Sequence, residues 1–324
     1  MNISAELFKP ANRKNQNRST NIVRPSLTYW QDVWRRLRKN RVAMVSLCVI
    51  ILITLISIAG PMFSPYSYSD QLKEQEGLRP CPEHPLGTDT LGRDMLVRVL
   101  YGARISLSVG IVASIINLVI GVLYGGIAGY FGGRVDSIMM RIVDILYVIP
   151  LTLYVILLMV IMDGYSEKIF SLPFLSMFRA AGPALISVYI ALGLTYWLEM
   201  ARIIRGQVLS LKEQEYVTAA RALGAGHLRI LLRHLIPNCI GSVIVIITLQ
   251  IPSAIFTEAF LSFIGLGVDA PMASLGSLAS DAAGSIRSYF YLLVSPSVAI
   301  CLIILAFNLF GDGIRDALDP RMRK

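Results

Sequence analysis

The sequence predicts an all-α, polytopic membrane protein with six transmembrane helices. Of its 324 residues, 55% are hydrophobic and only 16% are charged, and the mean hydropathy is +0.61. A soluble domain carries about 25% charged residues, so this composition excludes a soluble protein, and it also excludes disorder and collagen. The apolar residues form uncharged runs near the ~20 residues that a helix needs to cross the bilayer, at 42–63, 105–133, 145–162, 180–198, 235–257 and 288–311.

Each run is predicted to be a helix rather than a strand of a barrel. Backbone polar groups cannot stay unpaired in lipid, and the runs lack the alternation of polar and apolar residues that barrel strands show. Glycines and prolines interrupt several runs, among them Gly121, Gly125, Gly129 and Pro150. They are tolerated there because neighbouring helices can satisfy the freed backbone groups.

The distribution of basic residues predicts the orientation of the chain. Of the 30 Lys and Arg, 22 fall in the segments 1–41, 134–144, 199–234 and 312–324, and 8 fall in the alternate segments 64–104, 163–179 and 269–287. Cytoplasmic segments hold the excess of positive charge. Both termini are therefore predicted in the cytoplasm and residues 64–104 outside, and topology explains the net charge of +9 without a nucleic-acid ligand.

The N-terminal tail, residues 1–41, is predicted to be cytoplasmic and to precede an uncleaved first span at 42–63, since ~40 polar residues are too many for a signal peptide. Within the tail, Trp30, Val33, Trp34 and Leu37 share one helical face. This pattern predicts an amphipathic helix, which lies either in the membrane interface or against the cytoplasmic edge of the bundle.

The predicted external loop, residues 64–104, contains the stretch Gly87-Thr-Asp-Thr-Leu-Gly-Arg-Asp94. A short helix leading into the second span is expected, and its candidate capping residues are Thr88, Asp89 and Thr90. The side chains of Asp89, Arg93 and Asp94 are expected to shape the external mouth, with Arg93 paired to Asp94 or bound to backbone. They are not expected to act as catalytic groups.

The permease core, residues 105–311, is predicted to contain five helices and a cytoplasmic coupling loop at 199–238. Two short helices are expected in this loop, at 213–223 and 227–235, separated by Gly224-Ala-Gly226, because glycine permits the left-handed conformation that ends a helix. Alanines on the first helix let another backbone approach closely. The candidate partner-contact residues are Glu213, Glu215, Tyr216, Ala219, Ala220, Arg221, Gly224 and Pro237.

Few charged residues lie inside or beside the spans. Glu258 either lines a translocation pathway or makes a structural hydrogen bond to a neighbouring helix, and we favour the second hypothesis because an unpaired charge there is costly. Arg141 and Asp144, three residues apart, are expected to neutralise one another, as are Glu199 and Arg202. The cytoplasmic tail at 312–324 follows the last span.

Two segments of the coupling loop resemble the EAA loop of ABC importer permeases: Glu215-Tyr-Val-Thr-Ala-Ala-Arg-Ala-Leu-Gly-Ala225 and Arg233-His-Leu-Ile-Pro-Asn238. Three further stretches narrow this resemblance to the second, C-type permease subunit of dipeptide and oligopeptide importers. They are residues 87–94, Glu258-Ala-Phe-Leu-Ser-Phe-Ile-Gly-Leu-Gly267 and Asn308-Leu-Phe-Gly-Asp-Gly-Ile-Arg-Asp-Ala-Leu-Asp-Pro320, accompanied by Met140-Arg-Ile-Val-Asp144. Together the motifs cover nearly all of the chain beyond about residue 30.

The resemblance implies a type I ABC importer permease fold in a bacterial or archaeal cytoplasmic membrane. It also implies that the coupling loop docks into a nucleotide-binding subunit. The implied partners are a second homologous permease, two P-loop ATPase subunits, an extracellular or periplasmic solute-binding protein and a peptide substrate. ATP and Mg are then bound by the ATPase subunits, and the chain itself is expected to bind no cofactor.

Motifs for chemistry are missing from the sequence, which argues against an enzyme. The 324 residues contain no GxxxxGK[ST] phosphate loop, no Gly-x-Ser-x-Gly and no His-Glu-x-x-His, and the three histidines lie too far apart in sequence for a metal cluster. Three alternatives to a peptide permease are a nickel or glutathione importer permease of the same family, an ion-coupled secondary transporter and a membrane enzyme. The sequence does not specify the length or sequence preference of a peptide cargo.

Overall fold

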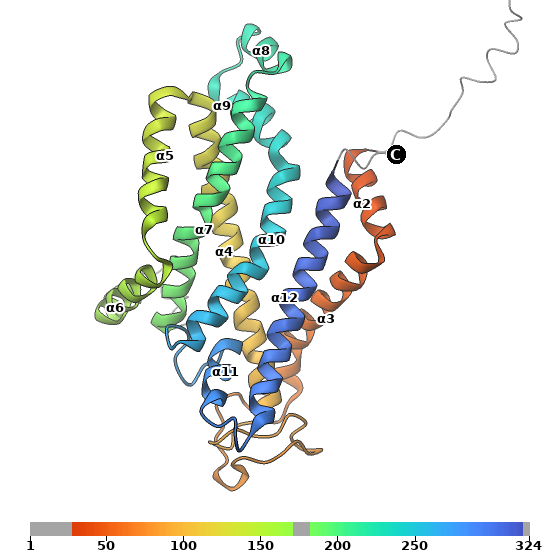
Figure 1. The fold of residues 1–324 in the computed structure, drawn as a ribbon, viewed down its shortest axis with the longest axis vertical. Helices are drawn as coiled ribbons and strands as arrows, with labels where there is room; N and C mark the ends of the chain where they lie inside the picture. The colour runs from red at the N-terminus through yellow and green to blue at the C-terminus, as the bar shows by residue number, and fades with distance from the viewer. Residues whose placement is uncertain (1–27, 171–181, 320–324) are drawn as a thin grey trace, which may run out of the picture.

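The computed structural model describes residues 28–170 and 182–319, and its regular secondary structure in these ranges is helical (Figure 1). Residues 1–27 of the predicted tail 1–41, residues 171–181, where the predicted segment 163–179 ends and the predicted span 180–198 begins, and the last five residues lie outside the described residues. Five helices there are long and apolar enough to span a membrane: α3 (Arg41–Phe63), α4 (Met95–Phe131), α7 (Gly182–Leu211), the continuous helix His227–Phe263 and α12 (Phe290–Leu318).

The third predicted span is a bent pair of helices. α5 (Gly133–Val148) and α6 (Leu151–Phe170) meet at an angle of 83° and pass the length and hydropathy criteria together. Pro150 lies in the break and disfavours helical backbone at the residue before it, and Ile149 is accordingly extended at φ −75° and ψ 122°. With this pair counted as one span, the helices number the six that the sequence predicts.

The centre of the bundle is the contact between α4 and α7. Gly121, Gly125 and Gly129 repeat at intervals of four residues and form one stripe on α4. A β-carbon on Gly121 would lie 2.6 Å from Met200, and one on Gly129 would lie 2.7 Å from the carbonyl oxygen of Arg205. The stripe therefore lets the two backbones approach more closely than larger side chains would allow.

The molecule has two ends that differ in construction (Figure 1). At the α8 end lie α8 (Glu215–Ala222), α2 (Tyr29–Lys39) and the last turn of α12. At the opposite end, here called the loop end, lie the connection from α3 to α4, with its short 3-10 helix η2 (Lys73–Gln75), and α11 (Leu275–Ala283). Both described extremities of the chain are thus at the α8 end.

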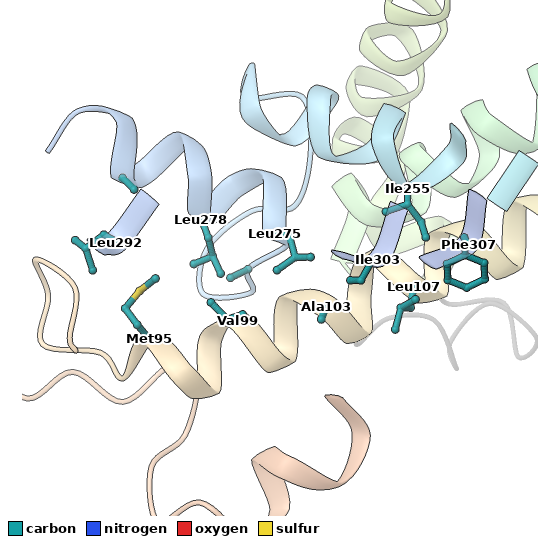
Figure 2. Close-up of a cluster of buried hydrophobic side chains, with 12 residues drawn as sticks. Met95, Val99, Ala103, Leu107, Ile255, Leu275, Leu278, Leu292, Ile303 and Phe307 are labelled. Carbon is teal, nitrogen blue, oxygen red and sulfur yellow. The ribbon is translucent and has the colours of Figure 1, made fainter. Parts of the chain in front are cut away.

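Each end has its own apolar core. At the loop end, α4, α10, α11 and α12 contribute Met95, Val99, Leu275, Leu278 and Phe307 among others, as Figure 2 shows. At the α8 end, Val208 of α7 packs with Val217 of α8 and Leu231. Both clusters are contiguous sets of buried side chains, and they hold the elements that carry the candidate sites.

The amphipathic N-terminal helix α2 docks on the bundle. Leu37 is buried in a small cluster with Ala43 of α3 and Ala317 of α12, and Val33 packs against the same cluster. Trp30 and Trp34, on the same apolar face, remain 51% and 50% exposed. Docking against the bundle edge therefore uses only part of the apolar face that the sequence predicts.

Several helices extend beyond the predicted spans: α7 runs to Leu211 and α12 to Leu318, past the predicted ends at 198 and 311. The helix that contains the second predicted span starts at Met95 rather than near residue 105, since Arg98 is paired with Asp89 inside the protein and Arg104 is exposed on the helix surface. The predicted separate helix at 227–235 is instead continuous with the fifth span. α9 (His227–Ile230) passes through a π-helical turn, η4 (Leu231–Leu235), into α10 (Ile236–Phe263), and Pro237 lies directly after this turn, where the regular ladder of helical hydrogen bonds is interrupted.

Candidate functional site

The connection between α7 and α9 projects α8 from one end of the bundle (Figure 1). α8 ends where the amide of Gly224 donates to the carbonyl oxygen of Arg221 and the amide of Ala225 donates to that of Ala220, both at 3.0 Å. Gly224 has φ +82°. The prediction that glycine ends this helix in a left-handed conformation is confirmed.

Few contacts hold α8 against the bundle. Val217 is fully buried in the core of the α8 end, and it is the buried residue of this helix. The Tyr216 hydroxyl accepts a hydrogen bond from Asn238 Nδ2 at 3.3 Å, which ties α8 to the start of α10. Below it, Tyr130 of α4 hydrogen-bonds His227 Nδ1 at 2.8 Å.

Most of the partner-contact candidates are exposed. Glu213, Glu215, Tyr216, Ala219, Arg221, Gly224 and Pro237 are exposed, and Ala220 is half-buried. Leu223, on the same predicted face of the helix, is 89% exposed, and two further apolar side chains that the sequence did not single out, Leu228 and Leu232, are exposed as well. Leu228 and Leu232 also line an open hollow of about 630 Å³. Their spacing of four residues is a signal that could have identified them.

At the loop end, the Gly87–Asp94 stretch forms a buried network rather than an open charged surface. Asp89 Oδ2 accepts from Arg93 Nε at 2.6 Å and from Arg98 Nη1, while Asp89 Oδ1 accepts from the backbone amides of Leu91 and Arg93 at 2.9 Å. The expectation that Arg93 pairs with Asp94 is wrong. Asp89 lies on the same turn and offers both of its oxygens to the arginines and the turn amides.

Asp94 has two other roles. Its Oδ1 accepts from the amide of Val97 at 2.8 Å and so caps α4, which corrects the prediction that Thr88, Asp89 or Thr90 does so. Its Oδ2 lies 2.7 Å from Nδ1 of the fully buried His84. The other ring nitrogen of His84 lies 2.9 Å from Gln75 Oε1, so the connection between α3 and α4 is fixed at several points.

Glu258 is fully buried between helices. Its Oε2 accepts from Ser106 of α4 at 2.6 Å, and its Oε1 accepts from Ser262 one turn along α10 at 2.8 Å. These bonds connect α10 to α4 and are the kind of contact that the structural hypothesis expects. A second buried polar pair, Asn117 of α4 with Gln250 of α10, joins the same two helices and was not anticipated.

The expected ion pairs within single helices are replaced by pairs between helices. Asp144 of α5 lies 2.8 Å from Arg202 of α7, rather than pairing with Arg141, and Arg202 therefore does not depend on Glu199. Asp136 of α5 accepts a bidentate contact from Arg205, with one bond of 2.6 Å. Asp136 and Asp144 lie eight residues apart on one helical face, which is the signal that the sequence offered for an α5–α7 contact.

No group of three or more His, Cys, Asp or Glu residues that could hold a metal ion occurs within the described ranges 28–170 and 182–319. The two ends of the molecule differ in which side chains they expose and which they bury. The α8 end presents an exposed helix with apolar and charged side chains, suited to contact with another protein. The loop end presents a buried arginine–carboxylate network beneath the connection from α3 to α4.

Comparisons with known proteins agree along the whole chain. Residues 121–324 match the family model of the binding-protein-dependent transport system inner membrane component, and residues 28–80 match that of the N-terminal TM domain of oligopeptide transport permease C. The oligopeptide transport system permease protein OppC of Bacillus subtilis is 46% identical over 100% of this chain and 99% of its own length.

Two further relatives and one solved structure extend this likeness. The dipeptide transport system permease protein DppC of Bacillus subtilis is 46% identical over 97% of this chain and 92% of its own. OppC of Escherichia coli is 41% identical over 95% and 96%. A chain of the MetNI methionine ABC transporter, solved in inward-facing conformations, matches in fold with a TM-score of 0.51, 19% identity and coverage of 69% of this chain and 96% of that chain.

Proposed function

The chain belongs to the family of binding-protein-dependent transport system inner membrane components, and from this premise we propose that it carries oligopeptides or dipeptides. It is the permease subunit of an ABC importer and forms half of the translocation pathway. The names of the relatives favour peptide cargo over nickel or glutathione. A second permease of similar fold supplies the other half, and a solute-binding protein delivers the cargo.

The observation that carries the mechanism is the exposure of α8. A short helix held by one buried valine, with Leu223 exposed to 89%, leaves apolar surface that water solvates poorly. The 324 residues contain no phosphate loop, so ATP and Mg belong to two separate ATPase subunits. Closure of those subunits moves α8, and α8 moves the helices that follow it, because α9 continues without a break into α10.

The decisive experiment changes the exposed face of α8. Leu223→Glu should abolish docking of the ATPase subunits and reduce peptide uptake and ATPase stimulation at least tenfold in a reconstituted transporter. Thr218→Glu, on the opposite, exposed face of the same helix, is the matched control and should retain both activities. Normal uptake in Leu223→Glu would contradict the proposed role of α8.

The proposed orientation places the α8 end in the cytoplasm and the loop end outside. The excess of basic residues in the segments predicted to be cytoplasmic supports it. In a variant that retains Cys81 as its only cysteine, a thiol reagent that cannot cross the cytoplasmic membrane should label intact cells, since Cys81 is free and partly exposed at the loop end. Labelling that occurs only after lysis would mean that the loop end lies in the cytoplasm, and would contradict the proposed orientation.

A further inference from the structure

A cavity of about 400 Å³ opens at the loop end between the start of α4, the loop at 268–272 and α11. This volume falls within the ~300–1,000 Å³ of small-ligand sites. Its wall combines two arginines and two aspartates with apolar side chains from the core of the loop end. The charged lining residues are Asp89, Arg93, Arg98 and Asp281.

The two arginines of this cavity share one buried carboxylate. Arg93 and Arg98 both bind the same carboxylate oxygen of Asp89, whose other oxygen already accepts two backbone amides. Both guanidinium groups and the carboxylate are buried. Asp281 is the second anion of the lining, so the four charged side chains are neutral together, but Asp89 is the one of the two acids that is buried with the arginines.

Arg98 is the arginine whose hydrogen bonding is incomplete. It is 3% exposed, and its Nε has no hydrogen-bond partner among the described residues. Asp281 of α11 is the second acid nearby, but its Oδ2 lies 3.6 Å from Arg98 Nη2, and its side chain is 61% exposed. This ion pair is longer than a hydrogen bond, so Asp281 balances the charge of Arg98 without satisfying its N–H donors.

The apolar side of the cavity is built on fixed packing. Met95, Leu278 and Leu292 line the cavity and also belong to the buried cluster in Figure 2. Met272 and Val268 complete this side from the adjoining loop. A ligand with a carboxylate at one end and an apolar side chain next to it would match both halves of the wall.

We propose that this cavity is a subsite for the C-terminal carboxylate of the transported peptide, with Arg98 as its anchor. A guanidinium binds a carboxylate through charge-assisted hydrogen bonds, and Arg98 has unused N–H donors for it. The side chain of the last peptide residue lies against Met95 and Leu278. The sequence offered no recognisable anchor residue, because Arg98 looks like an ordinary charge that precedes a span.

This inference rests on the proposed peptide cargo, and its test uses two forms of one photoreactive peptide. The permease–ATPase complex is reconstituted in nanodiscs without binding protein, so that the binding protein's own preference has no effect. A tripeptide that ends in a benzophenone amino acid is offered as the free acid or as the C-terminal amide. The free acid should crosslink to Met95 or Met272 at least tenfold more than the amide.

Two variants should change capture of the free acid in opposite directions, and a third should leave it unchanged. Arg98→Met should reduce capture of the free acid to the level of the amide, and it leaves Asp89 with Arg93 as a neutral pair, so folding should persist. Asp281→Asn should increase capture, because a competing carboxylate is removed from an exposed position. Arg104→Gln, on the exposed side of the same helix, is the matched control and should change nothing.

Equal capture of acid and amide, or no increase in Asp281→Asn, would overturn the subsite. The subsite would also be overturned if Arg98→Met weakened docking of the binding protein on the transporter while the unmodified permease showed no preference for the free acid. The peptide carboxylate would then be recognised by the binding protein and not by the permease. ATP-driven uptake of an unmodified tripeptide by the full transporter is measured in parallel. Uptake without acid-specific capture rejects the subsite alone, whereas absence of uptake rejects the peptide cargo.

Discussion

The loop end and the α8 end both use charged residues, but in opposite environments. At the loop end, Asp89, Asp94 and Arg98 are buried. Arg98 donates a hydrogen bond to Asp89, and Asp94 accepts one from the amide of Val97. At the α8 end, Glu213, Glu215 and Arg221 are exposed. The apolar residues differ in the same way, since Leu278 is buried at the loop end and Leu223 is exposed at the α8 end.

This difference shows which end is complete within one chain. Buried charges are stable only when their partners are present, and at the loop end most partners come from the same segment or the next helix. Exposed leucines beside a helix with one buried residue gain little within the chain and are expected to gain more against a partner. Loss of a buried carboxylate at the loop end should therefore act on folding, and substitutions at the α8 end should act on coupling.

The largest effect is expected from Asp89→Ala at the loop end. The change leaves two buried guanidinium groups without their carboxylate and should lower the free energy of unfolding by about 3–5 kcal/mol. The midpoint of thermal unfolding in detergent measures it. The control is Asp144→Ala, which removes an exposed ion pair to Arg202 worth about 0–1 kcal/mol. Equal losses in the two variants would remove the distinction between buried and exposed charge.

A large effect on coupling, with little effect on folding, is expected from Ala220→Trp. Ala220 is half-buried beside the exposed face of α8, so a bulky side chain there should keep a partner from closing on the helix. Peptide uptake and ATPase stimulation should fall together by at least tenfold, while the two permease subunits still co-purify. Normal uptake in this variant would mean that α8 is not the docking element.

The helical architecture could be predicted because lipid imposes one strong rule, that long uncharged segments form helices. That rule started the second span after Arg104, whereas helix α4 begins at Met95 and contains both Arg98 and Arg104. A charge ends a span only if it is unpaired, and the pairing of Arg98 with Asp89 depends on how the turn before the helix folds. Hydropathy alone does not contain that information.

The candidate sites were predictable to different degrees. The exposed residues of α8 lie in one short motif, so local sequence was enough to select them. The ion pairs were not predictable in the same way, because spacing within a helix identifies only local partners. Asp144 could have paired with Arg141 three residues away, but it meets Arg202 across the α5–α7 contact, 58 residues along the chain. Such pairs depend on tertiary packing.

The smallest effect, and the sharpest test of how α8 ends, is expected from Gly224→Ala. A β-carbon at this position would meet no described atom within 4 Å, so the cost arises only from the left-handed backbone at φ +82° and should be about 1–2 kcal/mol. Because the turn lies at the surface, that cost should appear as local opening, with amides 223–225 exchanging about 5–30-fold faster with deuterium and the thermal midpoint nearly unchanged. Gly206→Ala, in the interior of α7 with equally open space but no left-handed backbone, is the control and should stabilise its helix by about 0.5–1 kcal/mol. Faster exchange in both variants would mean that the loop responds to any added β-carbon, and the left-handed turn would then not be what positions α8.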